Sequence, residues 1–208
     1  MNKQLTVLAA GLLAALAAQA AGPVLIDAET PTSFASVLAH YDGGADSDGA
    51  IGPALGVQFG AGMLALQNDA AGTYFSNAPS PLGVLAPVDA DSTMNVAAGF
   101  SGSISLWYSA SQFSAQGVNV WSGLDGSGTL LASFNLVANA QQGCSDSDYC
   151  RFDQLSSSFF GTAHSVSFGN AANLAAFDNI SISAVPEPTS MLMLSLGLAT
   201  LVLARRRR

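Results

Sequence analysis

Short apolar runs, separated by glycine, proline, asparagine and aspartate, recur through the middle of this 208-residue chain. They follow one another at intervals of roughly 8–15 residues, as strands do in antiparallel sandwiches and barrels. Ser103–Tyr108 alternates clearly, with Ile104, Leu106 and Tyr108 on one face. No long amphipathic helical period appears in this region. The pattern predicts an all-β domain, an antiparallel β-sandwich of about ten short strands.

The strand predictions follow from these runs and from the turn residues between them. Tyr74–Pro87 contains three prolines and is expected to be mostly loop, and Asp42–Gly52 is a loop rich in glycine and aspartate. The expected strands are Val24–Ile26, Gly56–Phe59, Met63–Leu66, Met94–Phe100, Ser103–Tyr108, Val118–Trp121, Leu130–Val137, Leu155–Phe160, His164–Phe168 and Leu174–Ile182.

Charge is divided between the ends and the middle of the chain. Five of the six basic residues are Lys3 and Arg205–Arg208, whereas 13 of the 14 acidic residues lie between Asp27 and Asp178. Arg151 is the single arginine or lysine in that acidic region, so its net charge is near −12. Nucleic acid is therefore excluded as a partner, because it requires a basic surface. Divalent cations or a soluble matrix role suit this charge better.

The first 20 residues have the order of a secretory signal peptide. Lys3 precedes an apolar run, Leu5–Leu16, and Ala18-Gln19-Ala20 is a small-x-small cleavage site. We expect signal peptidase to cut before Ala21, so that residues 21–184 form the exported domain. A permanent membrane anchor is the alternative.

The last 24 residues, Val185–Arg208, also have three parts in a fixed order. A stiff Pro186-Glu187-Pro188 motif precedes an apolar run and then the four arginines. Thr189–Ala204 would make a helix of about 24 Å, which is shorter than the roughly 30 Å hydrocarbon core of a bilayer. Arginine snorkelling and local thinning would close that gap. The sequence predicts a transmembrane helix; a buried helix of a soluble domain is the alternative.

This order of parts resembles the PEP-CTERM sorting signal of bacteria with an outer membrane. The match rests on Val185, Pro186, Glu187 and Pro188, followed by the apolar run and Arg205, Arg206, Arg207 and Arg208. The resemblance implies an exosortase as partner, a membrane cysteine protease-transferase that would cut near the Pro-Glu-Pro motif. These residues would then be processed and would not catalyse anything. The arginines would stay on the cytoplasmic side until processing.

The middle of the chain has a second resemblance. The runs GVQF, MNVAAGFSGSISLWYS and FDNISIS are similar to a recurrent β-sandwich domain of exported PEP-CTERM proteins, which looks like the jelly-roll of carbohydrate-binding modules. This resemblance supports the fold. The sorting signal implies an envelope, surface or extracellular-matrix protein, for which we expect a structural or adhesive role in the exopolysaccharide of a biofilm. A carbohydrate-binding module is the alternative, and a glycan hydrolase or lyase is a third.

Three acids are candidates for a structural calcium site. On strict alternation, Asp178 shares a face with Ile180 and Ile182, where an unpaired carboxylate is costly. In jelly-roll carbohydrate modules an acid of the first strand often meets one of the last strand at calcium, and the resemblance suggests this for Asp27, Glu29 and Asp178. The alternatives are a bulge that turns Asp178 to solvent, or a hydrogen bond from nearby backbone.

The two cysteines and the two tryptophans are further candidates. Cys144 and Cys150 bracket five residues, and in an exported chain they are predicted to form a local disulfide. Trp107 and Trp121 are candidates for stacking on sugar rings, although aromatic residues of sandwiches usually belong to the core. Catalysis is not predicted, because the chain has only two histidines and no nucleophile elbow.

Overall fold

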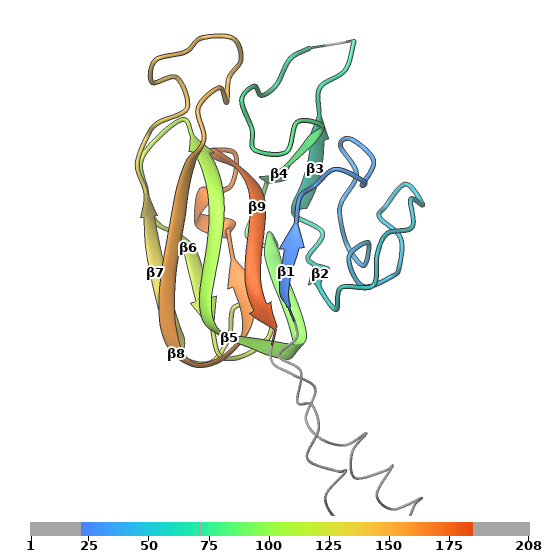
Figure 1. Ribbon diagram of the computed structural model, residues 1–208, viewed down its shortest axis with the longest axis vertical. Helices are drawn as coiled ribbons and strands as arrows, with labels where there is room; N and C mark the ends of the chain where they lie inside the picture. The colour runs from blue at the N-terminus through green and yellow to red at the C-terminus, as the bar shows by residue number, and fades with distance from the viewer. Residues whose placement is uncertain (1–21, 71, 185–208) are drawn as a thin grey trace, which may run out of the picture. The chain divides into compact units, whose positions relative to one another are not determined.

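The computed structural model describes residues 22–70 and 72–184, which form nine strands in one antiparallel sheet (Figure 1). The strand order is β3-β4-β9-β5-β8-β6-β7, with β1 beside β9 and β2 beside β5. The strands are β1 (Pro23–Ile26), β2 (Gln58–Phe59), β3 (Met63–Gln67), β4 (Gly83–Pro87), β5 (Thr93–Ala110), β6 (Ser114–Trp121), β7 (Leu130–Leu136), β8 (Asp153–Ser167) and β9 (Ala175–Ala184). A 3-10 turn, η2 (Gly169–Ala171), precedes β9. The predicted signal helix and transmembrane helix lie outside the described residues.

Strands β5 and β8 are each longer than the sequence predicted. The four strands expected at residues 94–100, 103–108, 155–160 and 164–168 join into two, because glycines bend the chain without ending the pairing. Gly99, Gly102 and Gly161 all have positive φ, and the β5–β8 register shifts beside them. A Cβ at Gly99 would lie 2.6 Å from the Thr162 side chain, so only glycine fits there.

These bends let β5 and β8 belong to both layers of a sandwich. The first part of β5 pairs with β2, and its second part pairs with β9. Likewise, the last part of β8 pairs with β6. Residues of β9 such as Phe177 and Ile182 therefore share one core with Val120 of β6 and Leu136 of β7. The predicted all-β antiparallel sandwich is confirmed, and its jelly-roll connectivity stays a prediction.

The region Tyr74–Pro87, predicted to be mostly loop, contains β4. This strand pairs with β3 along its length and meets β9 at Leu85, opposite Phe177. Pro87 is its last residue, where a missing N–H disturbs no interior hydrogen bond of the ladder. The prolines thus mark the end of a strand and the loop before it.

The long segment between β1 and β2 runs along the edge of β3 without forming a strand. Phe34 donates its backbone N–H to the carbonyl of Ala65 at 2.7 Å, and Val37 donates to Met63 at 2.9 Å. This pairing covers the open edge of the sheet.

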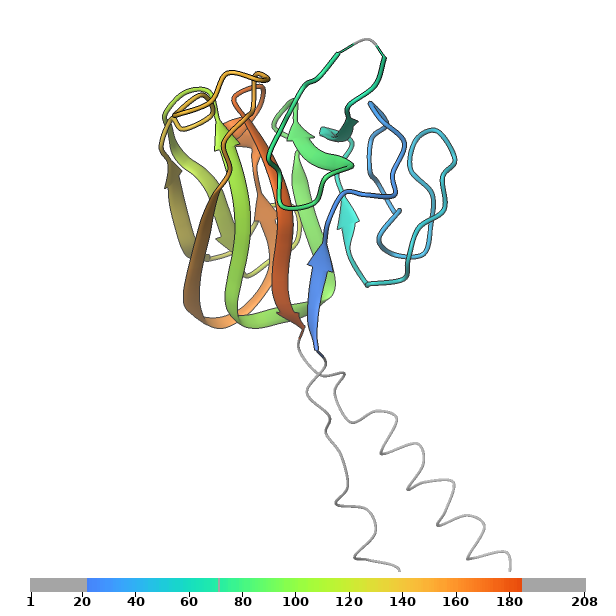
Figure 2. The same cartoon turned by 45° about the horizontal axis from the view of Figure 1, so that its top comes forward.

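The first and last described residues lie together at one end of the domain. Pro23 pairs with Ser183 in the β1–β9 ladder. Figures 1 and 2 show the start of β1 and the end of β9 at the lower end of the domain. Strand β9 begins at the opposite end with Ala175, about 30 Å away at roughly 3.3 Å per residue. The loop 137–152 lies at that upper end in both views. Among the described residues, no helix reaches the length and hydropathy required to cross a bilayer.

Candidate functional site

A second apolar cluster lies on the outer face of β3, β4, β9 and β5, which points away from the main core. In each strand its members alternate with main-core residues: Val84 adjoins Leu85, and Ala176 adjoins Phe177. The buried members are Leu66, Phe75, Val84, Phe152 and Ala176, and the partly buried ones are Tyr74, Ala78, Ala86, Trp107 and Tyr149. Two loop segments, residues 74–82 and 149–152, cover this face. We call this assembly the outer cluster.

The predicted disulfide between Cys144 and Cys150 is confirmed and helps to build the cover. Cys150 is buried. Its neighbour Tyr149 donates its N–H to the carbonyl of Tyr74 at 3.3 Å, and Ser76 donates back to the carbonyl of Tyr149 at 3.0 Å. The disulfide loop and the 74–76 segment are therefore joined side by side, and Tyr149 is held between them.

Asp178 lies on the outer face and does not share a face with Ile180 and Ile182, so the alternation prediction was wrong. Asn179 has φ 47° and forms a bulge, where two residues of β9 oppose one residue of β5. Beyond the bulge the side chains change face, and Asp178 pairs with Trp107. Asp178 is nevertheless fully buried, because the loop containing Ser80 lies over it.

Each of the three predicted calcium ligands accepts a hydrogen bond from a backbone N–H group. The Asp178 carboxylate accepts hydrogen bonds from the Ser80 N–H at 2.7 Å and from the Ser80 hydroxyl at 2.9 Å. Glu29 Oε1 accepts from the N–H of Leu82 at 2.8 Å, and Asp27 Oδ1 accepts from the N–H of Glu29 at 3.3 Å. Asp178 and Glu29 thus pin two points of one loop, residues 80–82.

The electrostatics of Asp178 reflect its burial. Burial raises the pKa of Asp178 to about 6, against hydrogen bonds from Ser80 and Asn179, and the Glu29 carboxylate raises it further. Within residues 22–70 and 72–184, no three His, Cys, Asp or Glu side chains are grouped so that they could hold a metal ion. Calcium binding by Asp27, Glu29 and Asp178 stays a prediction.

The Asp42–Gly52 loop is organised by a different carboxylate. Asp46 accepts hydrogen bonds from the backbone N–H groups of Thr32, Asp48 and Ala50 at 2.7, 3.0 and 2.8 Å. Burial opposes ionisation of Asp46, but these hydrogen bonds outweigh it and lower the pKa. His40, also buried, bonds to Thr30 and to the carbonyl of Ala50. Both side chains hold this loop together.

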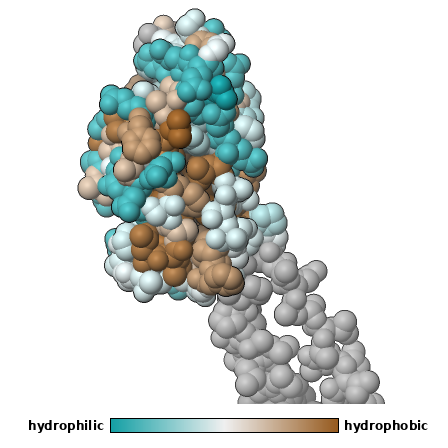
Figure 3. Space-filling model, turned by 90° about the vertical axis from the view of Figure 1, so that its left-hand side faces the viewer, coloured by the Kyte–Doolittle hydropathy of each residue, from teal (hydrophilic) through white to brown (hydrophobic). Residues whose placement is uncertain are grey.

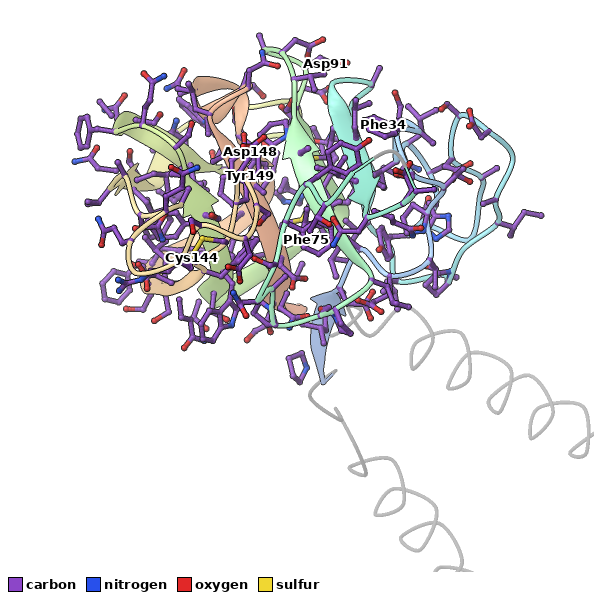
Figure 4. All side chains as sticks on the ribbon, turned by 90° about the horizontal axis from the view of Figure 1, so that it is seen from above. Phe34, Phe75, Asp91, Cys144, Asp148 and Tyr149 are labelled. Atoms are coloured by element: carbon purple, nitrogen blue, oxygen red, sulfur yellow. A yellow bond between two sulfur atoms is a disulfide. The ribbon has the colours of Figure 1, made fainter. Side chains whose placement is uncertain are left out.

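Two cavities meet at Tyr149, at the upper end of the domain. The larger, about 540 Å³, is lined by polar and apolar groups in about equal measure, and the smaller, about 260 Å³, is mainly apolar. Figure 4 shows Tyr149 and Asp148 near the middle of this end, with Cys144 to one side and Phe34 to the other. The larger cavity is lined by Ser111, Ala138–Gln142, Asp148 and Tyr149, and the smaller by Phe34, Leu64–Leu66, Tyr74, Ala86–Val88, Tyr149, Asn173 and Ala175.

The larger cavity presents hydrogen-bonding groups that the described protein does not use. Gln141 and Asp148 are exposed, and their side chains accept or donate no hydrogen bond to another described residue. Burial, with a smaller effect of the Asp148 carboxylate, raises the pKa of Tyr149, so its hydroxyl stays protonated. Among the described residues, no lysine or arginine lines either cavity. The upper end of the face that Figure 3 shows is correspondingly largely hydrophilic.

The apolar cavity is bordered by the exposed ring of Phe34 and the half-buried rings of Tyr74 and Tyr149. Phe34 and Tyr74 contact edge to face, with ring centroids 5.4 Å apart. Phe34 is 54% exposed and has φ 65°, a conformation that costs a bulky residue about 1–3 kcal/mol. The hydrogen bond from Phe34 to Ala65 holds this conformation. An exposed phenylalanine kept in a strained conformation marks this cavity as a candidate binding site.

The predicted aromatic contacts, Trp107 and Trp121, lie elsewhere. Both are partly buried; Trp107 packs in the outer cluster, and Trp121 Nε1 is inaccessible to solvent. Neither residue lines either of the two cavities described above. Sequence reasoning missed Phe34, Tyr74 and Tyr149 because they lie in loops without a strand pattern, although Tyr149 adjoins a disulfide cysteine.

Comparisons with known proteins add one family. Residues 184–208 match the PEP-CTERM protein-sorting motif, so the chain carries this motif, including Val185–Pro188 and Arg205–Arg208, which lie outside the described residues. This motif implies processing by an exosortase, and it is not a catalytic family. No curated protein matches the chain in sequence.

One solved structure is similar in shape. The K2 cleaved adhesin domain of Lys-gingipain (Kgp) superposes with a TM-score of 0.46 and 11% sequence identity, covering 77% of this chain and 99% of that domain. At this level of similarity we draw no conclusion from it about fold or function.

Proposed function

We propose that this protein is exported, is processed by an exosortase near Pro186–Pro188, and serves as a structural or adhesive component within exopolysaccharide at the cell surface. The PEP-CTERM match over residues 184–208 is the observation that carries this proposal. The local disulfide suits an oxidising, extracytoplasmic compartment. The acidic domain would stay soluble in a hydrated matrix.

The geometry of the domain supports display at a surface. The start of β1 and the end of β9 pair with each other at one end of the domain, and the 137–152 loop, part of which lines the larger cavity, lies at the other end (Figure 2).

The test is the intact mass of the protein from its native host, with and without the exosortase. We expect a form that begins at Ala21 and ends between Pro186 and Thr189, found only when the exosortase is present. A Glu187→Ala variant should stay uncut, whereas Glu29→Ala, outside the motif, should be cut normally. A tail that keeps Arg205–Arg208 in both strains would contradict the proposal.

A carbohydrate-binding module is the second candidate, favoured by the paired cavities at Tyr149. The glycan-hydrolase alternative gains no such support. A glycosidase needs two carboxylates roughly 5–10 Å apart across a cleft. Within residues 22–70 and 72–184, Asp148 is the single acid that lines the larger cavity, and no acid lines the smaller one.

A further inference from the structure

We propose that the two cavities meeting at Tyr149 bind an uncharged hexose polymer and discriminate against acidic polysaccharides. This inference rests on the proposed surface function and specifies its ligand. The larger cavity, at about 540 Å³, has the size of a small-molecule site. The smaller, apolar cavity shares Tyr149 with it as a lining residue.

The chemistry of the lining matches the two surfaces of a sugar ring. A pyranose presents hydroxyl groups at its rim and C–H groups on its faces. Gln141 and Asp148 offer amide and carboxylate groups that can bond to hydroxyls. Tyr149, Tyr74 and Phe34 offer ring faces for the C–H groups. A wholly apolar ligand would leave the polar groups of the larger cavity without hydrogen-bond partners.

The charges near the site select against acidic sugars. The nearest arginine in sequence, Arg151, is engaged: its Nε lies 3.1 Å from Asp153 Oδ1, and its Nη1 lies 3.3 Å from Gln142 Oε1. The uncompensated carboxylate is Asp148, which would repel a uronate. The acidic domain adds to this repulsion. An uncharged sugar meets none of these penalties.

The disulfide acts as a positioning device for this site. It closes the loop that carries Asp148 and Tyr149 and joins it to the 74–76 segment. A loop held in its binding geometry loses less conformational entropy when the ligand binds. Removing the disulfide should therefore weaken binding through disorder of Tyr149, although neither sulfur touches the ligand.

The experiment is titration calorimetry of the full chain, purified in detergent, with cellohexaose, laminarihexaose, mannohexaose and hexagalacturonate as separate probes. We expect at least one neutral hexasaccharide to bind, and hexagalacturonate to bind at least about tenfold more weakly. Tyr149→Ala should lower the affinity for the neutral hexasaccharide at least about tenfold. Phe160→Ala is the matched control, because Phe160 is 97% exposed and lines neither cavity; its affinity should be unchanged.

Three further variants sharpen the result. Asp148→Asn should reduce the difference in affinity between hexagalacturonate and the neutral probe. Gln141→Ala, an exposed loop change that should not disturb folding, should also weaken the neutral probe. The double variant Cys144→Ser/Cys150→Ser should weaken it while keeping the main unfolding transition.

Several outcomes would overturn the inference. The first is that the folded chain binds no neutral probe. The second is that hexagalacturonate binds as tightly as the neutral probe. The third is that Phe160→Ala and Tyr149→Ala lose the same amount of affinity. None of these would change the mass of the processed tail, so failure here is distinguishable from failure of the proposed sorting.

Discussion

The main core and the outer cluster are both apolar, yet they are built in different ways. The main core is filled by alternate residues of long, paired strands such as β5 and β9. The outer cluster is closed by loops, which need a disulfide and the Asp178–Ser80 and Glu29–Leu82 hydrogen bonds to stay in place. We infer that the main core determines whether the domain folds, and that the outer cluster shapes the candidate site.

The largest expected effect compares one phenylalanine from each region. Phe177→Ala removes a fully buried ring whose centroid lies 4.9 Å from that of Phe168. The substitution should lower the free energy of unfolding by about 3–5 kcal/mol. Phe75→Ala, also buried, should cost less, about 2–3 kcal/mol, because the covering loop can close into the space. Urea unfolding measures both. Equal losses would remove the distinction between the two regions.

The next effect is a pH dependence that originates in the outer cluster. The folded-state pKa of Asp178 is about 6, above its ordinary 3.8, so the folded state binds a proton more tightly than the unfolded state. This contribution to stability is therefore present below about pH 4 and declines as pH rises to about 6, by about 2–3 kcal/mol. The stability of Asp178→Asn should not show that decline. If the stabilities of the wild type and of Asp178→Asn change in parallel between pH 4 and 6, the predicted role of Asp178 is wrong.

The disulfide should contribute less, and mainly to the cover. In Cys144→Ser/Cys150→Ser, the loss of a short loop constraint should lower the free energy of unfolding by about 2 kcal/mol. Amide exchange should accelerate at Ser76 and Tyr149, whose N–H groups join the two loops, and stay slow in β5. Faster exchange throughout β5 would show that the disulfide supports the main core as well.

The smallest effect concerns the surface ion pair next to the disulfide. Arg151 and Asp153 are 45% and 38% exposed in their side chains, so Arg151→Gln should change stability by less than about 0.5 kcal/mol. Thermal unfolding at low and high salt checks this. A larger loss would mean that Arg151 also holds Gln142 and the loop around it.

Much of the main core could be predicted from the sequence. Ile104, Leu106 and Tyr108 face the core as their alternation indicates, since an unbroken strand must turn every second side chain to the same side. The number of strands was overestimated, because a glycine pattern does not distinguish a bend from a break. Gly99 and Gly161 bend strands that continue.

The candidate site was less predictable. The bulge at Asn179 changed the face on which Asp178 lies, and no pattern in AFDNISI announces that extra residue. Along the chain, Tyr74 follows Phe34 by 40 residues, and Tyr149 follows Tyr74 by 75. Loops have no hydrophobic period that would predict their meeting.

The sequence by itself determined the sorting motif, the charge division, the disulfide and the all-β class, because each depends on local order or composition. The tertiary structure alone decided which side of the sheet Asp178 faces, which loops cover the outer cluster, and that two cavities meet at Tyr149. These features depend on register shifts and on contacts between distant segments. A one-residue bulge is enough to move a side chain to the other face of the sheet.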